Sequence, residues 1–145
     1  MRSQSTQNPN LKIFLEANGK RLSLTLANTR AAQALLKLLP IECRLKDYGG
    51  FEKVGPLGAR LPSDDTWIEA LAGDVLLYTG NQIVLMLGTN AWNYTRLGRI
   101  DDVRGLAQTL GPAGVTIKIT TQYNEEVQNQ RNQMFRLRAN GQFPS

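Results

Sequence analysis

The sequence predicts a mainly β domain with two α-helices, and three observations support this fold class. Asn18-Gly19 separates two runs of alternating apolar and polar residues, and this dipeptide favours a type I′ hairpin turn, which needs two positive φ angles. Residues 75–78 and 83–87 are apolar on both faces of a strand, and the short break between them requires antiparallel pairing. Residues 32–39 and 103–110 repeat apolar side chains at helical spacing.

The composition is that of one globular domain. The chain has 145 residues, 41% of them hydrophobic, so it can bury a sizeable core without a metal or a disulfide. We expect its single cysteine, Cys43, to be a buried, inert thiol on a strand. No apolar run approaches the roughly 18–20 residues that span a bilayer, and the first residues lack the apolar centre of a signal peptide. We therefore expect a cytoplasmic protein with no membrane partner.

The chain divides into a leader, a folded domain and a tail. Residues 1–10 are mostly Ser, Gln and Asn, so we expect a disordered leader. Residues 11–121 contain the regular apolar patterns and form the domain. Residues 122–145 form a polar C-terminal tail, because their few apolar residues define no buried face at any one period.

A hairpin and a helix are the first elements of the domain. Residues 11–17 and 21–26 alternate apolar and polar side chains and form the two strands of the hairpin. Asn28 or Thr29 can cap the helix that follows, because a side-chain oxygen there accepts a hydrogen bond from a free backbone N–H. Apolar residues recur along one face of this helix, and Pro40 ends it.

A strand, a long loop and a turn come next. We expect a strand at residues 41–47, ended by a pair of glycines. Residues 51–65 contain several glycines and prolines, so they should form a long ordered loop with a short strand near residues 52–54. Residues 66–71, which include Trp67, should form a short turn or a single helical turn.

The central apolar hairpin is followed by a loop, a strand, a helix and a last strand. Residues 88–93 are expected to form an aromatic loop, and residues 94–98 a strand. Asp101 caps the second helix, whose apolar stripe at residues 103–110 ends at a Gly-Pro pair. Alternation at residues 115–120 predicts the last strand.

The basic net charge raises the question of nucleic-acid binding. The chain has 17 basic and 12 acidic residues, a net charge of +5. The excess of cations lies in the first hairpin and the residues after it, where they alternate with Leu and Ile as on the solvent face of a half-buried sheet. Nucleic-acid binding through this hairpin is therefore only a third functional alternative, and it predicts affinity that falls steeply with salt.

The order of elements and five short motifs resemble a known family. In chain order the motifs are LLP at residues 38–40, DYGGFEKVGPL at 47–57, ARLP at 59–62, AGDVLLY at 72–78 and RLGRID at 96–101. Together they resemble the small bacterial cyclophilin-like proteins, a family of largely unassigned function, over residues 11–121. The resemblance implies a cyclophilin-like fold, a closed β-barrel of about eight strands with an α-helix capping each end and a groove on one side.

The resemblance also implies what the groove could bind. In true cyclophilins the groove binds a proline-containing peptide and isomerises its X-Pro bond. The motif with their essential arginine, FHRVIPGFMIQGGD, has no counterpart in this sequence, which also contains no histidine. We therefore expect a non-catalytic barrel that binds a small molecule or a peptide in the groove. The alternative is a weak peptidyl-prolyl isomerase in which Arg60 or Arg96 donates to the prolyl nitrogen.

No catalytic constellation is present among the residues themselves. Without histidine and with one cysteine, Ser-His and Cys-His catalysis and His-rich zinc sites are excluded. We expect no cofactor and no metal site. The candidate ligand-binding residues are aromatics and arginines in or beside the two loops: Tyr48, Arg60, Trp67, Trp92, Tyr94 and Arg96. In the alternative interpretation the tryptophans close the barrel ends, the arginines pair with Glu52 or Asp74, and Asp47 and Glu52 bond loop backbone N–H groups.

Overall fold

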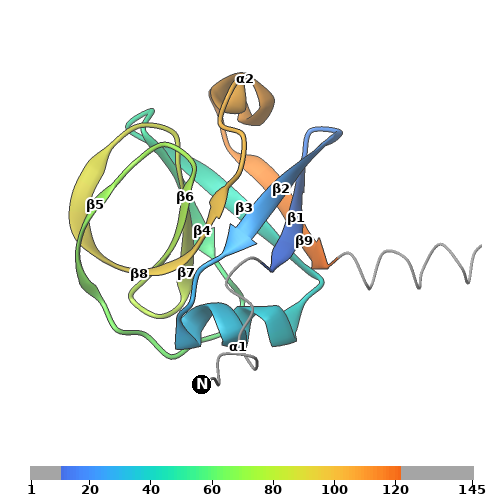
Figure 1. Cartoon of the computed structure of the whole chain (residues 1–145). Helices are drawn as coiled ribbons and strands as arrows, with labels where there is room; N and C mark the ends of the chain where they lie inside the picture. Colours follow the sequence, from blue (N-terminus) through green and yellow to red (C-terminus); the bar gives the residue numbers. More distant parts are fainter. Residues whose placement is uncertain (1–10, 122–145) are drawn as a thin grey trace, which may run out of the picture.

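The computed structural model describes residues 11–121, which form nine strands and two helices (Figure 1). The first five elements in chain order are β1 Lys12–Ala17, β2 Lys20–Leu26, α1 Arg30–Leu38, β3 Ile41–Tyr48 and β4 Glu52–Pro56. The remaining six are β5 Thr66–Ala70, β6 Asp74–Tyr78, β7 Gln82–Met86, β8 Asn90–Ile100, α2 Leu106–Leu110 and β9 Val115–Thr121. The predicted leader at residues 1–10 and the predicted tail at residues 122–145 lie outside the described residues.

The strands form one antiparallel sheet that closes on itself. Their order is β2-β1-β9-β3-β4-β7-β6-β8-β5, and an additional pairing of β2 with β8 joins all strands except β5 into a ring, which we call the barrel. Gly98 lies at this closure, where a Cβ atom would come within 2.6 Å of the Thr25 carbonyl oxygen, so only glycine allows the two strands this approach. The predicted fold class, mainly β with about eight barrel strands and two helices, is confirmed.

An apolar core fills the barrel, and each helix covers one of its ends (Figure 1). Ala32 and Leu35 of α1 and Leu106 and Leu110 of α2 are buried in this core. Thr29 caps α1 as predicted, because its hydroxyl oxygen accepts a hydrogen bond of 3.0 Å from the Ala32 N–H. Neither helix of the described residues has the length and apolarity to cross a membrane.

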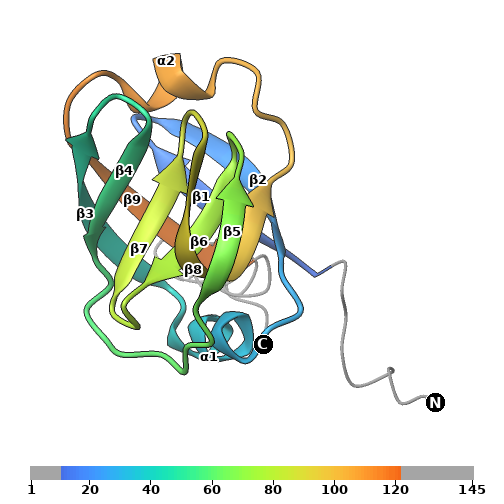
Figure 2. The same cartoon turned by 90° about the vertical axis from the view of Figure 1, so that its left-hand side faces the viewer.

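The hairpin of β6 and β7 is buried on both faces because it lies between two apolar clusters. Its inward side chains belong to the core of the barrel: Val75, Leu77, Ile83 and Leu85. Its outward side chains belong to a second cluster on the outer face of the barrel: Leu76, Val84 and Met86. Figure 2 shows this side of the molecule, where β4, β7, β6, β8 and β5 lie. The prediction of a hairpin that is apolar on both faces is confirmed, and the outer cluster explains it.

The first half of β8 leaves the barrel to pair with β5. The second half of β8 pairs with β6, whereas Asn90 to Tyr94 pair with β5. The aromatic loop predicted at residues 88–93 is therefore wrong from Asn90 onwards, and the turn predicted at residues 66–71 is wrong because this segment is strand β5. Only the third and fifth residues of β5 are buried, so its own pattern is too short to indicate a strand.

The short strand predicted near residues 52–54 is confirmed as β4 and is longer than expected. The loop expected around it at residues 51–65 begins only after Pro56, because β4 pairs with β3 on one side and with β7 on the other. Gly55 suits this position, since a Cβ atom there would clash with the Arg44 carbonyl oxygen. The glycines and prolines of this segment indicated a loop. In the structure, Gly55 is instead needed for the close contact between β4 and β3.

The second helix is shorter than predicted and starts differently. It begins after Gly105, whose φ angle is 71°, and no side chain of residues 11–121 caps it. The Asp101 carboxylate, which was the predicted cap, accepts hydrogen bonds from Ser23 Oγ and Thr25 Oγ1, both at 2.6 Å. Val103, expected on the apolar stripe, precedes the helix and is 38% exposed. Asp101 therefore ties the end of β8 to β2 instead of starting α2.

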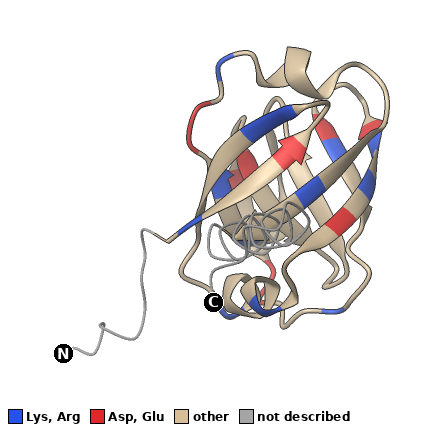
Figure 3. Ribbon diagram, turned by 90° about the vertical axis from the view of Figure 1, so that its right-hand side faces the viewer, with Lys and Arg blue, Asp and Glu red and all other residues tan. Residues whose placement is uncertain are grey.

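The cations of the first hairpin lie on a surface of mixed charge. Lys12 Nζ is 2.9 Å from Asp101 Oδ2, and the Arg21 guanidinium carbon lies 3.9 Å from the centre of the Phe14 ring. Figure 3 shows acidic segments interspersed among the basic ones on this side of the molecule. Such a pattern is typical of a solvated sheet face.

Candidate functional site

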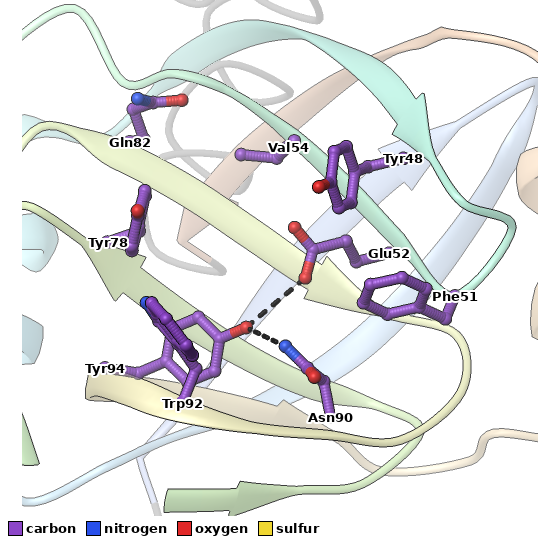
Figure 4. Close-up of a pocket in the computed structure, with 9 residues that line it drawn as sticks. All are labelled: Tyr48, Phe51, Glu52, Val54, Tyr78, Gln82, Asn90, Trp92 and Tyr94. Atoms are coloured by element: carbon purple, nitrogen blue, oxygen red, sulfur yellow. Dashed lines mark hydrogen bonds between the residues drawn. The ribbon is translucent and has the colours of Figure 1, made fainter. Parts of the chain in front are cut away.

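An aromatic pocket lies on the outer face of the barrel, between β4 and the first half of β8 (Figure 4). Its volume of about 440 Å³ falls within the range typical of ligand pockets. The described residues that line it are Tyr48, Phe51, Glu52, Val54, Tyr78, Gln82, Asn90, Trp92 and Tyr94. Five of these nine residues are aromatic.

Strand alternation places these side chains on the outer face. Successive residues of a strand point to opposite faces, so Glu52 and Val54 point outward from β4, while Lys53 between them points into the barrel. The outward apolar residues of β7 lie opposite them in register and pack beneath the pocket. Trp92 and Tyr94 come from the part of β8 that pairs with β5 and form the opposite wall. The pocket thus depends on the departure of β8 from the barrel.

A buried carboxylate lies in the middle of these rings. Glu52 is 8% exposed, and its Oε1 accepts a hydrogen bond of 3.3 Å from the Tyr94 hydroxyl (Figure 4). That hydroxyl in turn accepts a hydrogen bond of 3.0 Å from the Asn90 amide. Burial raises the pKa of Glu52, and the hydrogen bond from Tyr94 offsets only part of the rise. Burial also raises the pKa of Tyr94, which keeps its hydroxyl protonated as the donor.

Replacing Glu52 by glutamine should stabilise the protein near neutral pH. Because the folded-state pKa of Glu52 is raised, its contribution to stability is present below the unfolded-state pKa and is lost as the pH rises through the folded-state pKa. Glutamine keeps an acceptor for Tyr94 and removes the buried charge. We expect the free energy of unfolding to rise by up to roughly 2 kcal/mol near neutral pH, with a gain that shrinks on acidification.

Urea denaturation of both proteins at several pH values measures this difference. Glu69→Gln is the matched control, because Glu69 is exposed on β5, and it should change the free energy of unfolding by less than about 0.5 kcal/mol. A stability gain for Glu52→Gln that grows on acidification would contradict the raised pKa of Glu52.

Three of the six predicted binding residues line the aromatic pocket. Tyr48 and Trp92 are 61% and 47% exposed, whereas Tyr94 is buried. Trp67 lies beside the pocket, with its ring centre 6.3 Å from that of Trp92. The alternative in which the tryptophans close the barrel ends is wrong, because both belong to the paired strands β5 and β8 on its side.

The two predicted arginines lie elsewhere. Arg60 Nη1 donates to the Thr79 carbonyl oxygen at 3.2 Å, next to the turn between β6 and β7. Arg96 Nη1 lies 3.5 Å from Asp74 Oδ2, which confirms the alternative that this arginine pairs with Asp74. Asp74 also binds Arg99, at 2.6 Å. Within residues 11–121, no arginine lines the aromatic pocket.

Most of the remaining pocket residues have no clear signal in the sequence. Five of them were not predicted: Phe51, Val54, Tyr78, Gln82 and Asn90. The prediction that Asp47 and Glu52 bond backbone N–H groups is confirmed for Asp47, which accepts from the Gly50 N–H at 3.2 Å. It is wrong for Glu52, whose partner is a tyrosine hydroxyl. Alternation along the short strand predicted near residues 52–54 was the available signal, but the faces of this strand were not assigned because the segment around it was expected to be a loop.

The described part of the chain contains possible metal ligands and a single thiol. Within residues 11–121, no group of three or more Cys, Asp or Glu side chains is placed to hold a metal ion. Cys43 is buried, as predicted, and burial raises the pKa of its thiol. The chemistry of the aromatic pocket is therefore that of ring faces, two amides and one carboxylate.

Comparisons with known proteins agree with this architecture. The solution structure of a hypothetical protein from Archaeoglobus fulgidus matches with a TM-score of 0.60 and 16% sequence identity, over 79% of this chain and 97% of that chain. At this identity the likeness concerns the fold alone. A search of curated proteins returns no significant match. The model of the cyclophilin-like family matches residues 15–122, and the protein therefore belongs to the cyclophilin-like family.

Proposed function

We propose that this protein is a binding module whose aromatic pocket holds a small molecule or a short peptide. The observation behind the proposal is the Glu52 carboxylate, which is buried among aromatic rings although burial raises its pKa. Groups whose charged form is destabilised by their surroundings are concentrated at functional sites. A ligand that gives this carboxylate a partner explains why the chain keeps an acid there.

The walls of the pocket are formed before a ligand arrives. The rings of Tyr48 and Phe51 pack edge to face with centres 5.7 Å apart, and those of Tyr78 and Tyr94 do so at 6.2 Å. Such contacts hold the rings in place, so less side-chain entropy is lost on binding. The amide of Gln82 adds a hydrogen-bonding group that can orient the ligand.

The two alternative functions have weaker support. Isomerisation of a prolyl bond needs a donor beside an apolar pocket, and Arg60 and Arg96, the candidates for this role, bond to Thr79 and Asp74 instead. Nucleic-acid binding needs a concentration of free cations, whereas Lys12 of the first hairpin pairs with Asp101. A binding module that uses the aromatic pocket needs neither group.

Chemical-shift mapping tests the proposal with a library of small-molecule fragments and proline-containing peptides. We expect binders to shift the indole N–H signal of Trp92 and the amides of β4 and of the first half of β8, while the amides of β9 on the far side of the barrel stay unchanged. Trp92→Ala should weaken binding by about tenfold or more, because aromatic residues commonly dominate binding energy.

Trp67→Ala is the matched control, since Trp67 lies beside the pocket without lining it. Its affinity for the same binders should stay within about threefold of the wild type. If every binder found shifts residues other than 48–54 and 90–94, the aromatic pocket is not the site.

A further inference from the structure

We propose that the aromatic pocket selects an organic cation, namely an ammonium group with methyl or other alkyl substituents, and that Glu52 is its counter-ion. This inference rests on the proposed function and narrows it from a ligand of any charge to a cation. Three features of the described residues support it: the charge inside the pocket, the orientation of its rings and the chemistry of its surface.

Glu52 is the only acidic or basic residue among the described residues that line the pocket. Its neighbour Lys53 points into the barrel, where its Nζ contacts Asp47 Oδ1 at 3.0 Å and the carbonyl oxygens of Gly111 and Ala113 at 2.8 and 2.6 Å. None of the ion pairs within residues 11–121 includes Glu52. A buried carboxylate without a cationic partner is costly, and a bound cation supplies that partner.

The rings around Glu52 face in different directions. Figure 4 shows its carboxylate between Tyr48 and Phe51 on one side and Trp92 and Tyr94 on the other. The rings of Tyr48 and Phe51 are inclined to each other by 76°, and those of Tyr78 and Tyr94 by 62°. A flat ligand can stack on only one ring of each pair, whereas a rounded group can contact several faces at once. Ring faces attract cations, so a rounded cation fits best.

The surface of the pocket favours a ligand nitrogen with alkyl substituents over one with N–H bonds. A primary ammonium group brings three N–H donors, each of which needs an acceptor after it leaves water. Five of the nine described lining residues are aromatic, so the pocket replaces part of that hydration with apolar surface. Alkyl groups in place of the N–H bonds remove the need for acceptors, and they let the rings bury apolar area while Glu52 still balances the charge.

Choline and 3,3-dimethylbutan-1-ol are a matched pair of probes, because they differ only in the exchange of a charged nitrogen for a neutral carbon. We expect choline to shift the Trp92 indole signal and to bind about tenfold more tightly than the neutral alcohol. Glu52→Gln should weaken choline binding by about tenfold and change the affinity of the alcohol by less than about twofold. Glu69→Gln, which removes an exposed acid from β5, is the control and should bind choline like the wild type.

The outcomes separate this inference from the proposed function. Equal affinity of both probes at the pocket would overturn the selection of a cation and leave the binding module standing. Choline binding that Glu52→Gln leaves unchanged would also overturn it, provided that urea denaturation shows the variant to be folded. Failure of choline, the alcohol and the fragment and peptide library to shift residues of β4 or β8 would overturn both proposals.

Discussion

Replacing Leu85 by alanine should destabilise the protein by roughly 2–5 kcal/mol. Leu85 lies in the middle of β7, is completely buried, and pairs in register with Val75 of β6 and Lys53 of β4. Truncation removes its packing contacts and leaves a cavity. The surrounding strands cannot collapse into this space, because each is hydrogen-bonded to a neighbour on both sides within the barrel.

Urea denaturation measures this loss, with Leu71→Ala as the matched control. Leu71 follows β5 and is 53% exposed, so the same truncation there should cost less than about 0.5 kcal/mol. A loss of under about 1 kcal/mol for Leu85→Ala would mean that the core of the barrel does not lie against β7.

Strands that pair with a neighbour in the chain could be predicted from local pattern. The hairpin of β1 and β2 follows from alternation and from Asn18-Gly19, whose φ angles of 50° and 80° are both positive, as the predicted turn requires. The hairpin of β6 and β7 follows in the same way from two apolar runs and a short break. In both cases the partner strand lies within a few residues, so the sequence contains the whole signal.

Elements that depend on distant partners could not be predicted in this way. β5 pairs only with β8 within the described residues, and just two of its five side chains are buried. β4 was predicted only as a short strand near residues 52–54, because its glycine and proline indicate a loop when the partner strands are unknown. The glycine is needed there because β4 packs closely against β3. Tertiary pairing decides the state of such segments.

The aromatic pocket was predictable only in part for the same reason. Tyr48, Trp92 and Tyr94 are large amphipathic residues, and residue type alone identifies them as candidates. Glu52 is a buried acid whose hydrogen-bond donor, Tyr94, lies 42 positions later in the chain. A lone glutamate in a short strand within an expected loop gives no sign of burial, since most glutamates are exposed.

Replacing Lys53 by methionine should destabilise the protein by roughly 2–5 kcal/mol, for electrostatic rather than packing reasons. The side chain is completely buried inside the barrel, and its Nζ contacts Asp47 Oδ1, Gly111 O and Ala113 O at 3.0, 2.8 and 2.6 Å. These acceptors match the three N–H donors of an ammonium group. Methionine fills the space of the apolar stem but leaves all three acceptors without this donor.

The acceptors of Lys53 connect separate parts of the chain, so the effect should reach α2. Asp47 belongs to β3, whereas the two carbonyl groups lie between α2 and β9. We expect the amides of α2 to exchange with solvent faster in Lys53→Met than in the wild type. Lys46→Met is the matched control, because Lys46 is an exposed neighbour of Asp47, and its free energy of unfolding should stay within about 0.5 kcal/mol of the wild type. Equal urea midpoints for the two variants would mean that the buried ammonium adds no net stability and that other contacts hold α2 on the barrel, among them the burial of Leu106 and Leu110.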